Sequence, residues 1–156
     1  MNHSTRPVHL KALHAAPAAG FDEPFEMLSA CHERVERMLR LMERLAAHLA
    51  NAGADAQAAA AARDVMRYFD VAGPAHHEDE ERHILPALAA AGQAPLAEQL
   101  HAEHVAMADG WRAVRADLAE VAARRWDEAR GSPVRDRWLA FAAGYRAHIA
   151  LPESAA

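Results

Sequence analysis

The residues best suited to chemistry lie in one short run, residues 75–86, with the sequence AHHEDEERHILP. It holds three histidines and four acidic residues before a proline. On a helix, residues four apart lie on the same face, one turn from each other. The pairs His76–Glu80 and His77–Glu81 could therefore each offer a nitrogen and a carboxylate oxygen to one metal ion. Taken alone, the run is explained better as a solvated acidic face. Whether it binds metal therefore depends on where the other histidines of the chain lie.

Four segments carry apolar residues at helical spacing, and we expect helices at about 25–50, 56–91, 95–125 and 134–151. Asp55 is expected to cap the second helix, Gly53 to follow the end of the first, and Pro74 to bend or break the second. Pro152 is expected to end the fourth helix. Short connections between four amphipathic helices predict an all-α protein, an antiparallel up-down-up-down four-helix bundle over residues 21–156. Residues 1–20 are expected to form an N-terminal arm.

Each expected helix has a histidine in its apolar stripe. These are His32, then His76 or His77, then His104 with His101 one turn earlier, and finally His148. A single histidine in such a stripe is more often a hydrogen-bonded core residue than a ligand. Several imidazoles buried in one core would each cost about 1–3 kcal/mol without a partner, and a metal ion satisfies all of them. Periodicity alone does not choose between His76 and His77.

Composition narrows the class of protein. The 156 residues suffice for one domain, and their net charge of −5 without a basic stripe argues against a nucleic-acid partner. No apolar run is long enough for a membrane helix, and the first 20 residues do not have the pattern of a secretory signal. The single cysteine, Cys31, excludes an internal disulfide and suits a reducing compartment. We therefore expect a cytoplasmic protein without a membrane contact. The position of Cys31 beside His32 suggests a redox sensor, but Cys31 is better explained as a small residue that packs in the helix interface.

The run HHEDEERHILPAL resembles the signature of the hemerythrin-like, HHE cation-binding domains. The segments LSACHERVERM, LHAEHVAM and YRAHIALPE are similar to the first, third and fourth helices of that family. The resemblance covers nearly all of the chain after about residue 21. It implies the metal ligands His32, His76, Glu80, His104 and His148, with His101 as a second candidate on the third helix. Alignment on Pro86 favours His76 over His77, which would then lie beside the ligands or over the site.

The chain departs from the family pattern in its fourth helix. The family usually has a carboxylate about one turn after the histidine, but here that position is Pro152. The nearest carboxylate is Glu153, five residues after His148. A helical step of five residues rotates a side chain well away from the site, so Glu153 would bridge only if Pro152 reshapes the backbone.

The resemblance implies two irons, bridged by Glu80 and Glu153 with an oxo or hydroxo group. Imidazole and carboxylate donors also suit manganese or zinc. The function implied is binding or sensing of O2 or a related small molecule. Two alternatives stay open: a di-iron enzyme that acts on peroxide or nitric oxide, and a bundle with partial metal occupancy that acts through protein partners not identified by the sequence. The sequence shows no activated nucleophile or acid–base pair, which disfavours hydrolysis and group transfer.

Overall fold

The computed structural model describes the backbone of residues 24–155 and the side chains of residues 30–150. The expected N-terminal arm, residues 1–20, lies outside this part of the chain. Between residues 24 and 155 the protein is helical, with no strand. The elements are α2 (Pro24–Ala52), α3 (Ala56–Asp79), η1 (Glu80–Ile84), α4 (Leu85–Ala90), α5 (Ala94–Ala122), η2 (Glu128–Arg130) and α6 (Gly131–Ala155). None of the described helices is long and apolar enough to cross a membrane.

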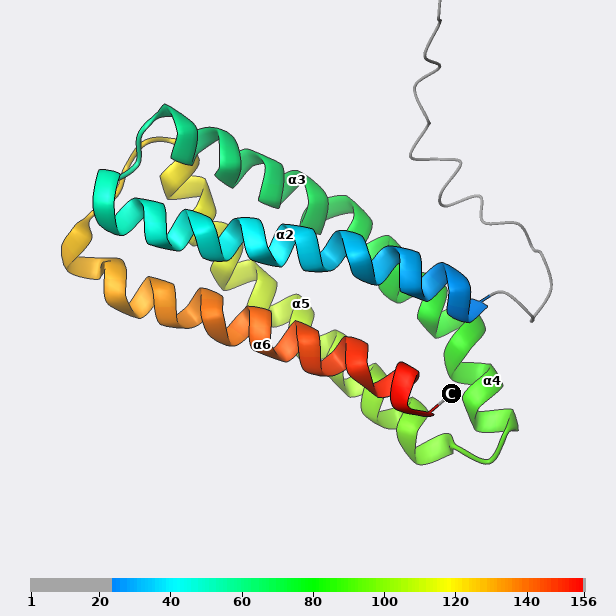
Figure 1. The fold of residues 1–156 in the computed structure, drawn as a ribbon. Helices are drawn as coiled ribbons and strands as arrows, with labels where there is room; N and C mark the ends of the chain where they lie inside the picture. The colour runs from blue at the N-terminus through cyan, green and yellow to red at the C-terminus, as the bar shows by residue number, and fades with distance from the viewer. Residues whose placement is uncertain (1–23, 156) are drawn as a thin grey trace, which may run out of the picture.

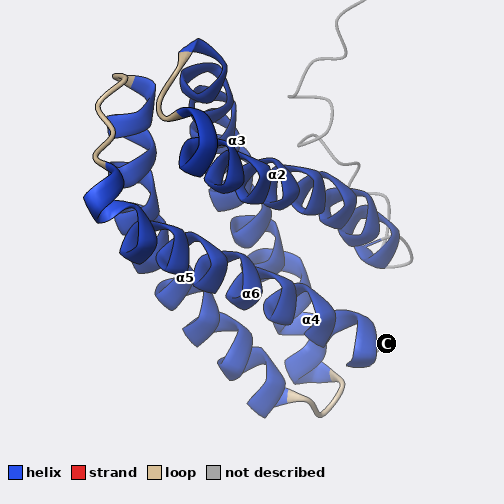
Figure 2. Cartoon of the chain, turned by 60° about the vertical axis from the view of Figure 1, so that its left-hand side comes forward, coloured by secondary structure: helices blue, strands red, loops and turns tan. Residues whose placement is uncertain are grey.

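The four long helices form a bundle. Helix α2 packs on α3, α3 on α5, α5 on α6, and α6 on α2, so each long helix has two neighbours. The loops that join α2 to α3 and α5 to α6 lie at one end of the bundle, and α4 lies at the other (Figure 1). Seen from another side, α4 sits at the foot of the bundle, where it packs against α5 (Figure 2).

The buried apolar residues form two clusters of unequal size. The large cluster fills most of the bundle and includes Leu39, Phe69, Leu118 and Trp138. The small cluster joins α4 and η1 to the start of α5 and is made of Ile84, Leu85, Leu88, Ala97 and Leu100. The predicted site residues of α3, η1 and α5 lie between the stretches that supply these clusters. The centre is therefore bounded by apolar packing on both sides.

The turn between α2 and α3 follows the predicted chemistry. The side chain of Asp55 accepts a hydrogen bond of 2.9 Å from the backbone N–H of Ala58, which confirms Asp55 as the cap of α3. Gly53 has a φ of 67°, and its N–H donates to the carbonyl of Leu49. A residue without Cβ adopts this left-handed conformation at little cost, so glycine ends α2 as expected.

The second helical stretch contains an irregularity at a place that the sequence analysis did not predict. Helix α3 continues through Pro74, and the change comes at Glu80–Ile84, which form a π-helix. The N–H of Leu85 bonds to the carbonyl of Glu80, five residues back instead of four. Pro86 follows at once and has no N–H to donate, so it cannot continue the regular ladder. Such π turns are frequent at functional sites, and this one begins at the candidate ligand Glu80.

Helix α6 differs from the prediction at its end. Pro152 was expected to stop the helix, but the helix continues to Ala155. Proline has a φ close to the helical value and removes only its own donor, so a final turn can pass through it. Glu153 therefore lies on the last turn of α6, and its side chain is outside the described part of the structure.

Candidate metal centre

Six of the eight residues expected to bind metal come together in two groups. One group is His32, His76 and Glu80, and the other is His77, His104 and His148. Within each group, one ligand atom per residue lies within 4.8 Å of the others. The six residues come from α2, α3, η1, α5 and α6, so all four long helices contribute.

The first group combines two imidazoles with a carboxylate. The rings of His32 and His76 have centroids 5.7 Å apart and are nearly perpendicular, at 79°. Nε2 of His76 lies 2.6 Å from Oε1 of Glu80, one helical turn further along the chain. All three residues are buried, and Glu80 is only 1% exposed. Two histidines and a carboxylate are a donor set that suits divalent iron.

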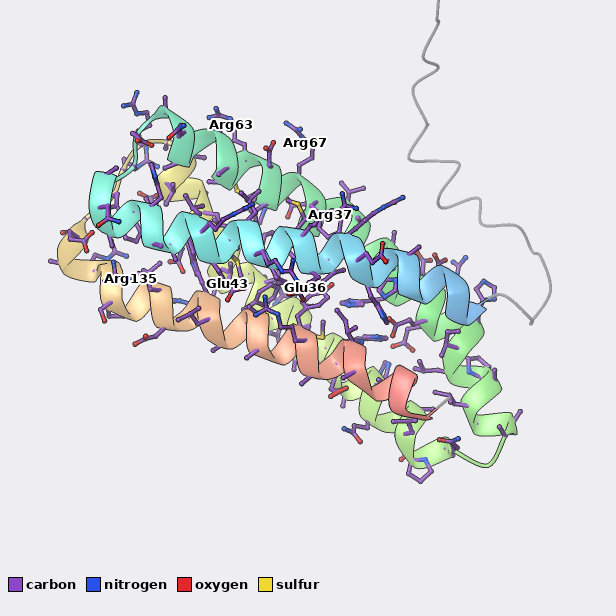
Figure 3. All side chains as sticks on the ribbon, in the orientation of Figure 1. Glu36, Arg37, Glu43, Arg63, Arg67 and Arg135 are labelled. Carbon is purple, nitrogen blue, oxygen red and sulfur yellow. The ribbon has the colours of Figure 1, made fainter. Side chains whose placement is uncertain are left out.

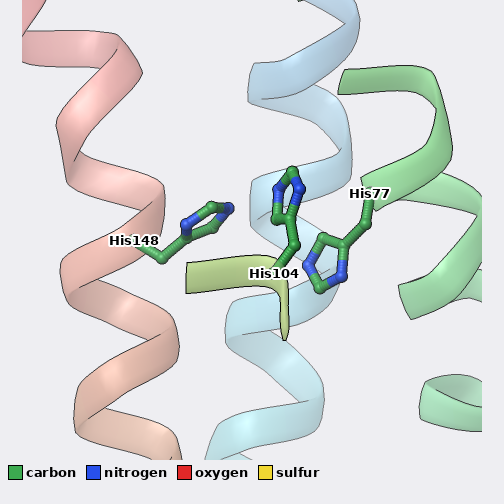
Figure 4. Close-up of side chains that lie close together, drawn as sticks. All are labelled: His77, His104 and His148. Carbon is green, nitrogen blue, oxygen red and sulfur yellow. The ribbon is translucent and has the colours of Figure 1, made fainter. Parts of the chain in front are cut away.

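The second group consists of imidazoles alone. His77, His104 and His148 come from three different helices and gather in one place (Figure 4). The rings of His77 and His104 are stacked, with centroids 4.4 Å apart. The ring centroids of His104 and His148 are 4.8 Å apart, and the angle between the ring planes is 62°. His104 and His148 are buried, and His77 is half-buried.

Glu80 connects the two groups. Its Oε1 faces His76, and its Oε2 lies 3.0 Å from Nε2 of His104 and 3.3 Å from Nε2 of His148. One buried carboxylate thus presents one oxygen to each group. A carboxylate in this position can bridge two cations, as in other bundle sites that hold two metals.

Buried polar atoms in the centre fit a cation. Nε2 of His76, Nε2 of His148 and Oε1 of Glu80 are buried and have no hydrogen-bond partner among the described residues. The contact of 2.6 Å between His76 and Glu80 does not have the alignment of a hydrogen bond. Leaving such atoms without a partner is costly, and metal ions bound in the two groups would satisfy all three. The residues present therefore fit a bound metal.

The negative charge of Glu80 also favours a cation. Burial alone would raise the pKa of Glu80, but the imidazoles of His104, His148 and His76 lower it below its ordinary value. Burial alone would lower the pKa of His76, but Cys31 and Glu80 together raise it to about 9. The carboxylate is therefore ionised and His76 carries a proton. A metal ion that binds here displaces this proton.

His77 differs from His76 in its charge and in its partner. Burial, followed by the nearby charge of His104, lowers the pKa of His77 to about 3, so its ring is neutral. The hydroxyl of Tyr145 lies 3.2 Å from Nε2 of His77. Burial raises the pKa of Tyr145, so this hydroxyl keeps its proton. His76 and His77 face different groups, so they do not compete for one position as the sequence analysis assumed. The preference for His76 as the ligand stays a prediction.

His101, another expected ligand, lies outside both groups. The side chain of His101 is 63% exposed, and its Nδ1 lies 2.8 Å from Oε1 of Glu81. Glu81 was considered as a partner of His77, but it contacts His101 and His104 instead. Sequence reasoning missed Glu103, whose Oε2 lies 3.1 Å from Nδ1 of His148. Its position directly before His104 is the only signal in the sequence, and it does not reveal a contact with another helix.

The fold and the site define a helical-bundle protein with a candidate metal centre. The family model described as the hemerythrin HHE cation binding domain matches residues 23–155. An uncharacterized protein from Haemophilus influenzae is 32% identical over 139 residues, which are 86% of this chain and 77% of that protein. No solved structure matches the chain. The chain belongs to the hemerythrin HHE cation-binding family, which confirms the predicted resemblance.

Proposed function

We propose that this protein holds two irons and binds or senses O2 or a related small molecule. The observation that carries the proposal is the position of Glu80, which presents one oxygen to each of two groups of ligands. The antiparallel order expected for the four helices would bring these groups to one level of the bundle. Two ferrous ions would supply the electrons with which dioxygen is bound.

The donor atoms support iron over softer metals. Both groups offer only imidazole nitrogen and carboxylate oxygen, which suit iron, manganese and zinc. Cys31 contacts His76 and belongs to neither group. A site without a thiolate is less suited to ions such as Cu(I), which prefer sulfur.

The protein residues would position the irons and limit access to them. His32 and His76 would hold one iron, His104 and His148 the other, and Glu80 would bridge the two. We include Glu153 in the proposal as a second bridging carboxylate from the last turn of α6. The apolar clusters on either side would keep bulk water away from the irons, which favours reversible binding over oxidation.

Anaerobic loading with Fe(II), followed by exposure to air and then to argon, tests the proposal. We expect a new visible absorption band in air that disappears under argon over repeated cycles. An irreversible change to ferric protein would contradict reversible binding. Rapid loss of added peroxide or nitric oxide without a stable adduct would instead support the enzyme alternative.

A further inference from the structure

Two carboxylates outside the six candidate ligands contact Nδ1 of two ligand histidines. Oε1 of Glu81 lies 2.7 Å from Nδ1 of His104, and Oε2 of Glu103 lies 3.1 Å from Nδ1 of His148. In both rings the other nitrogen, Nε2, faces Oε2 of Glu80. Both carboxylates reach the ring from a neighbouring element, Glu81 from η1 to α5 and Glu103 from α5 to α6.

We infer that Glu81 and Glu103 are positioning residues that fix the orientation of His104 and His148 and strengthen the binding of the metal ion on that side of the centre. The inference rests on the proposed metal-binding function. A carboxylate only accepts hydrogen bonds, so Nδ1 of each ring must donate. When a metal ion displaces the proton that Nε2 of His104 donates to Glu80, Nδ1 keeps its own proton and Nε2 offers its lone pair to the metal.

The two carboxylates also change the strength of the ligands. A histidine that donates its second N–H to a carboxylate is a more basic ligand, and loss of such a partner typically lowers metal affinity by about 10–100-fold. Glu81 is partly exposed and also contacts the exposed His101, so it connects the buried ring of His104 with the surface. Glu81 and Glu103 contact histidines of α5 and α6, so their effect should be confined to the ion bound there.

The test compares Glu81→Gln, Glu103→Gln and the double variant by titration with Co²⁺, followed by the visible absorption of the bound ion. Glutamine keeps the shape of the side chain but removes the charge that holds the N–H of the ring. Glu78→Gln is the matched control, because Glu78 is an exposed neighbour in the same acidic run that pairs with Arg82.

We expect the wild type to bind two Co²⁺, and the double variant to bind one of them about 10–100-fold more weakly, while the other changes less than about twofold. In a His32→Ala background, the glutamine substitutions should lower the affinity for the remaining Co²⁺ by the same factor. In a His148→Ala background, Glu81→Gln and Glu103→Gln should have little effect. The conservative variants Glu81→Asp and Glu103→Asp, which keep the charge, should recover part of the affinity.

Equal weakening of both ions, or no change in either, would overturn the inference. The same conclusion would follow if Glu78→Gln weakened binding as much as Glu81→Gln. Failure of the wild type to bind any metal would contradict the proposed function itself, which is a distinct result. Circular dichroism of each variant separates loss of affinity from loss of fold, and the aspartate variants keep the test decisive if a glutamine variant does not fold.

Discussion

The hydroxyl of Tyr145 lies 3.2 Å from Nε2 of His77, at the point where the large apolar cluster meets the histidines. The ring of Tyr145 is buried against Phe69 and Phe141. Gly73 packs beside this hydroxyl, since a Cβ at residue 73 would lie 3.4 Å from it. Tyr145 therefore joins the apolar packing of the bundle to the polar centre.

Tyr145→Phe should keep this packing and remove the hydrogen bond. We expect the protein to bind as much metal as the wild type, because Tyr145 belongs to neither ligand group. The free energy of unfolding of the chelated protein should fall by about 1 kcal/mol, because the ring of His77 loses its partner. Urea denaturation measures this change. Tyr68→Phe is the control, and an equal effect of both substitutions would contradict the role assigned to Tyr145.

Metal binding should stabilise the fold without being required for it. An ion that binds only the native state adds RT ln(1 + [L]/Kd), about 2.7 kcal/mol at one hundred times Kd. The large apolar cluster does not depend on the centre, so the chelated protein should remain helical and unfold cooperatively. Thermal unfolding followed by circular dichroism, with iron and with a chelator, tests both statements. Equal melting temperatures would refute the first, and a chelated protein without helix would refute the second.

An ion-pair cluster between α2 and α6 should give a pH-dependent contribution to stability. Arg146 on α6 donates to Glu36 and Glu43, both on α2, and these carboxylates lie between the two helices (Figure 3). The hydrogen bond from Arg146 is the main cause that lowers the pKa of Glu36 below 4.5. The stabilisation linked to Glu36 is therefore present above about pH 4.5 and is lost as the pH falls through the lower pKa of the folded protein.

Arg146→Met should accordingly destabilise the protein at pH 7 by up to about 1 kcal/mol, since the pairs are partly exposed and screened by solvent. The difference from the wild type should shrink as the pH falls below about 4. Urea unfolding at several pH values measures it. Arg112→Met is the control, because Arg112 forms an exposed pair with Asp109 on its own helix. A difference that does not change with pH would argue for lost packing in place of lost charge.

His101→Ala should leave the metal content unchanged. The side chain of His101 is largely exposed and contacts Glu81, outside both ligand groups. The sequence resemblance names His101 as a second candidate ligand on α5, so the result decides between the two positions. We expect His104→Ala, measured in parallel, to lose iron. Greater loss from His101→Ala than from His104→Ala would reverse the assignment.

Much of the fold could be predicted because it depends on short-range patterns. Helical spacing located the four long helices, and Asp55 and Gly53 marked a boundary through local backbone chemistry. The π-helix at Glu80–Ile84 was not predicted, because helical spacing gives no signal for one extra residue in a turn. The predicted end of α6 was wrong, because Pro152 was assumed to stop the helix, whereas a proline can also lie within a last helical turn.

The candidate site was predictable in part for a similar reason. One histidine in each apolar stripe indicated which residues would meet in the core, and the six gathered residues were all named. Their division into two groups, with His76 and His77 in different ones, depends on rotation of α3 against its neighbours. The contacts of Glu81 with His104 and of Glu103 with His148 join different elements, so spacing along the chain could not reveal them.

The most direct test of the proposed centre is the iron content of Glu80→Ala beside that of the wild type. Among the side chains of residues 30–150, Glu80 presents one oxygen to each ligand group, so its removal should affect both ions at once. We expect two irons per chain in the wild type and in the control Glu78→Ala, and less than one in Glu80→Ala. Full retention of iron by Glu80→Ala would contradict the account of a centre bridged by this carboxylate.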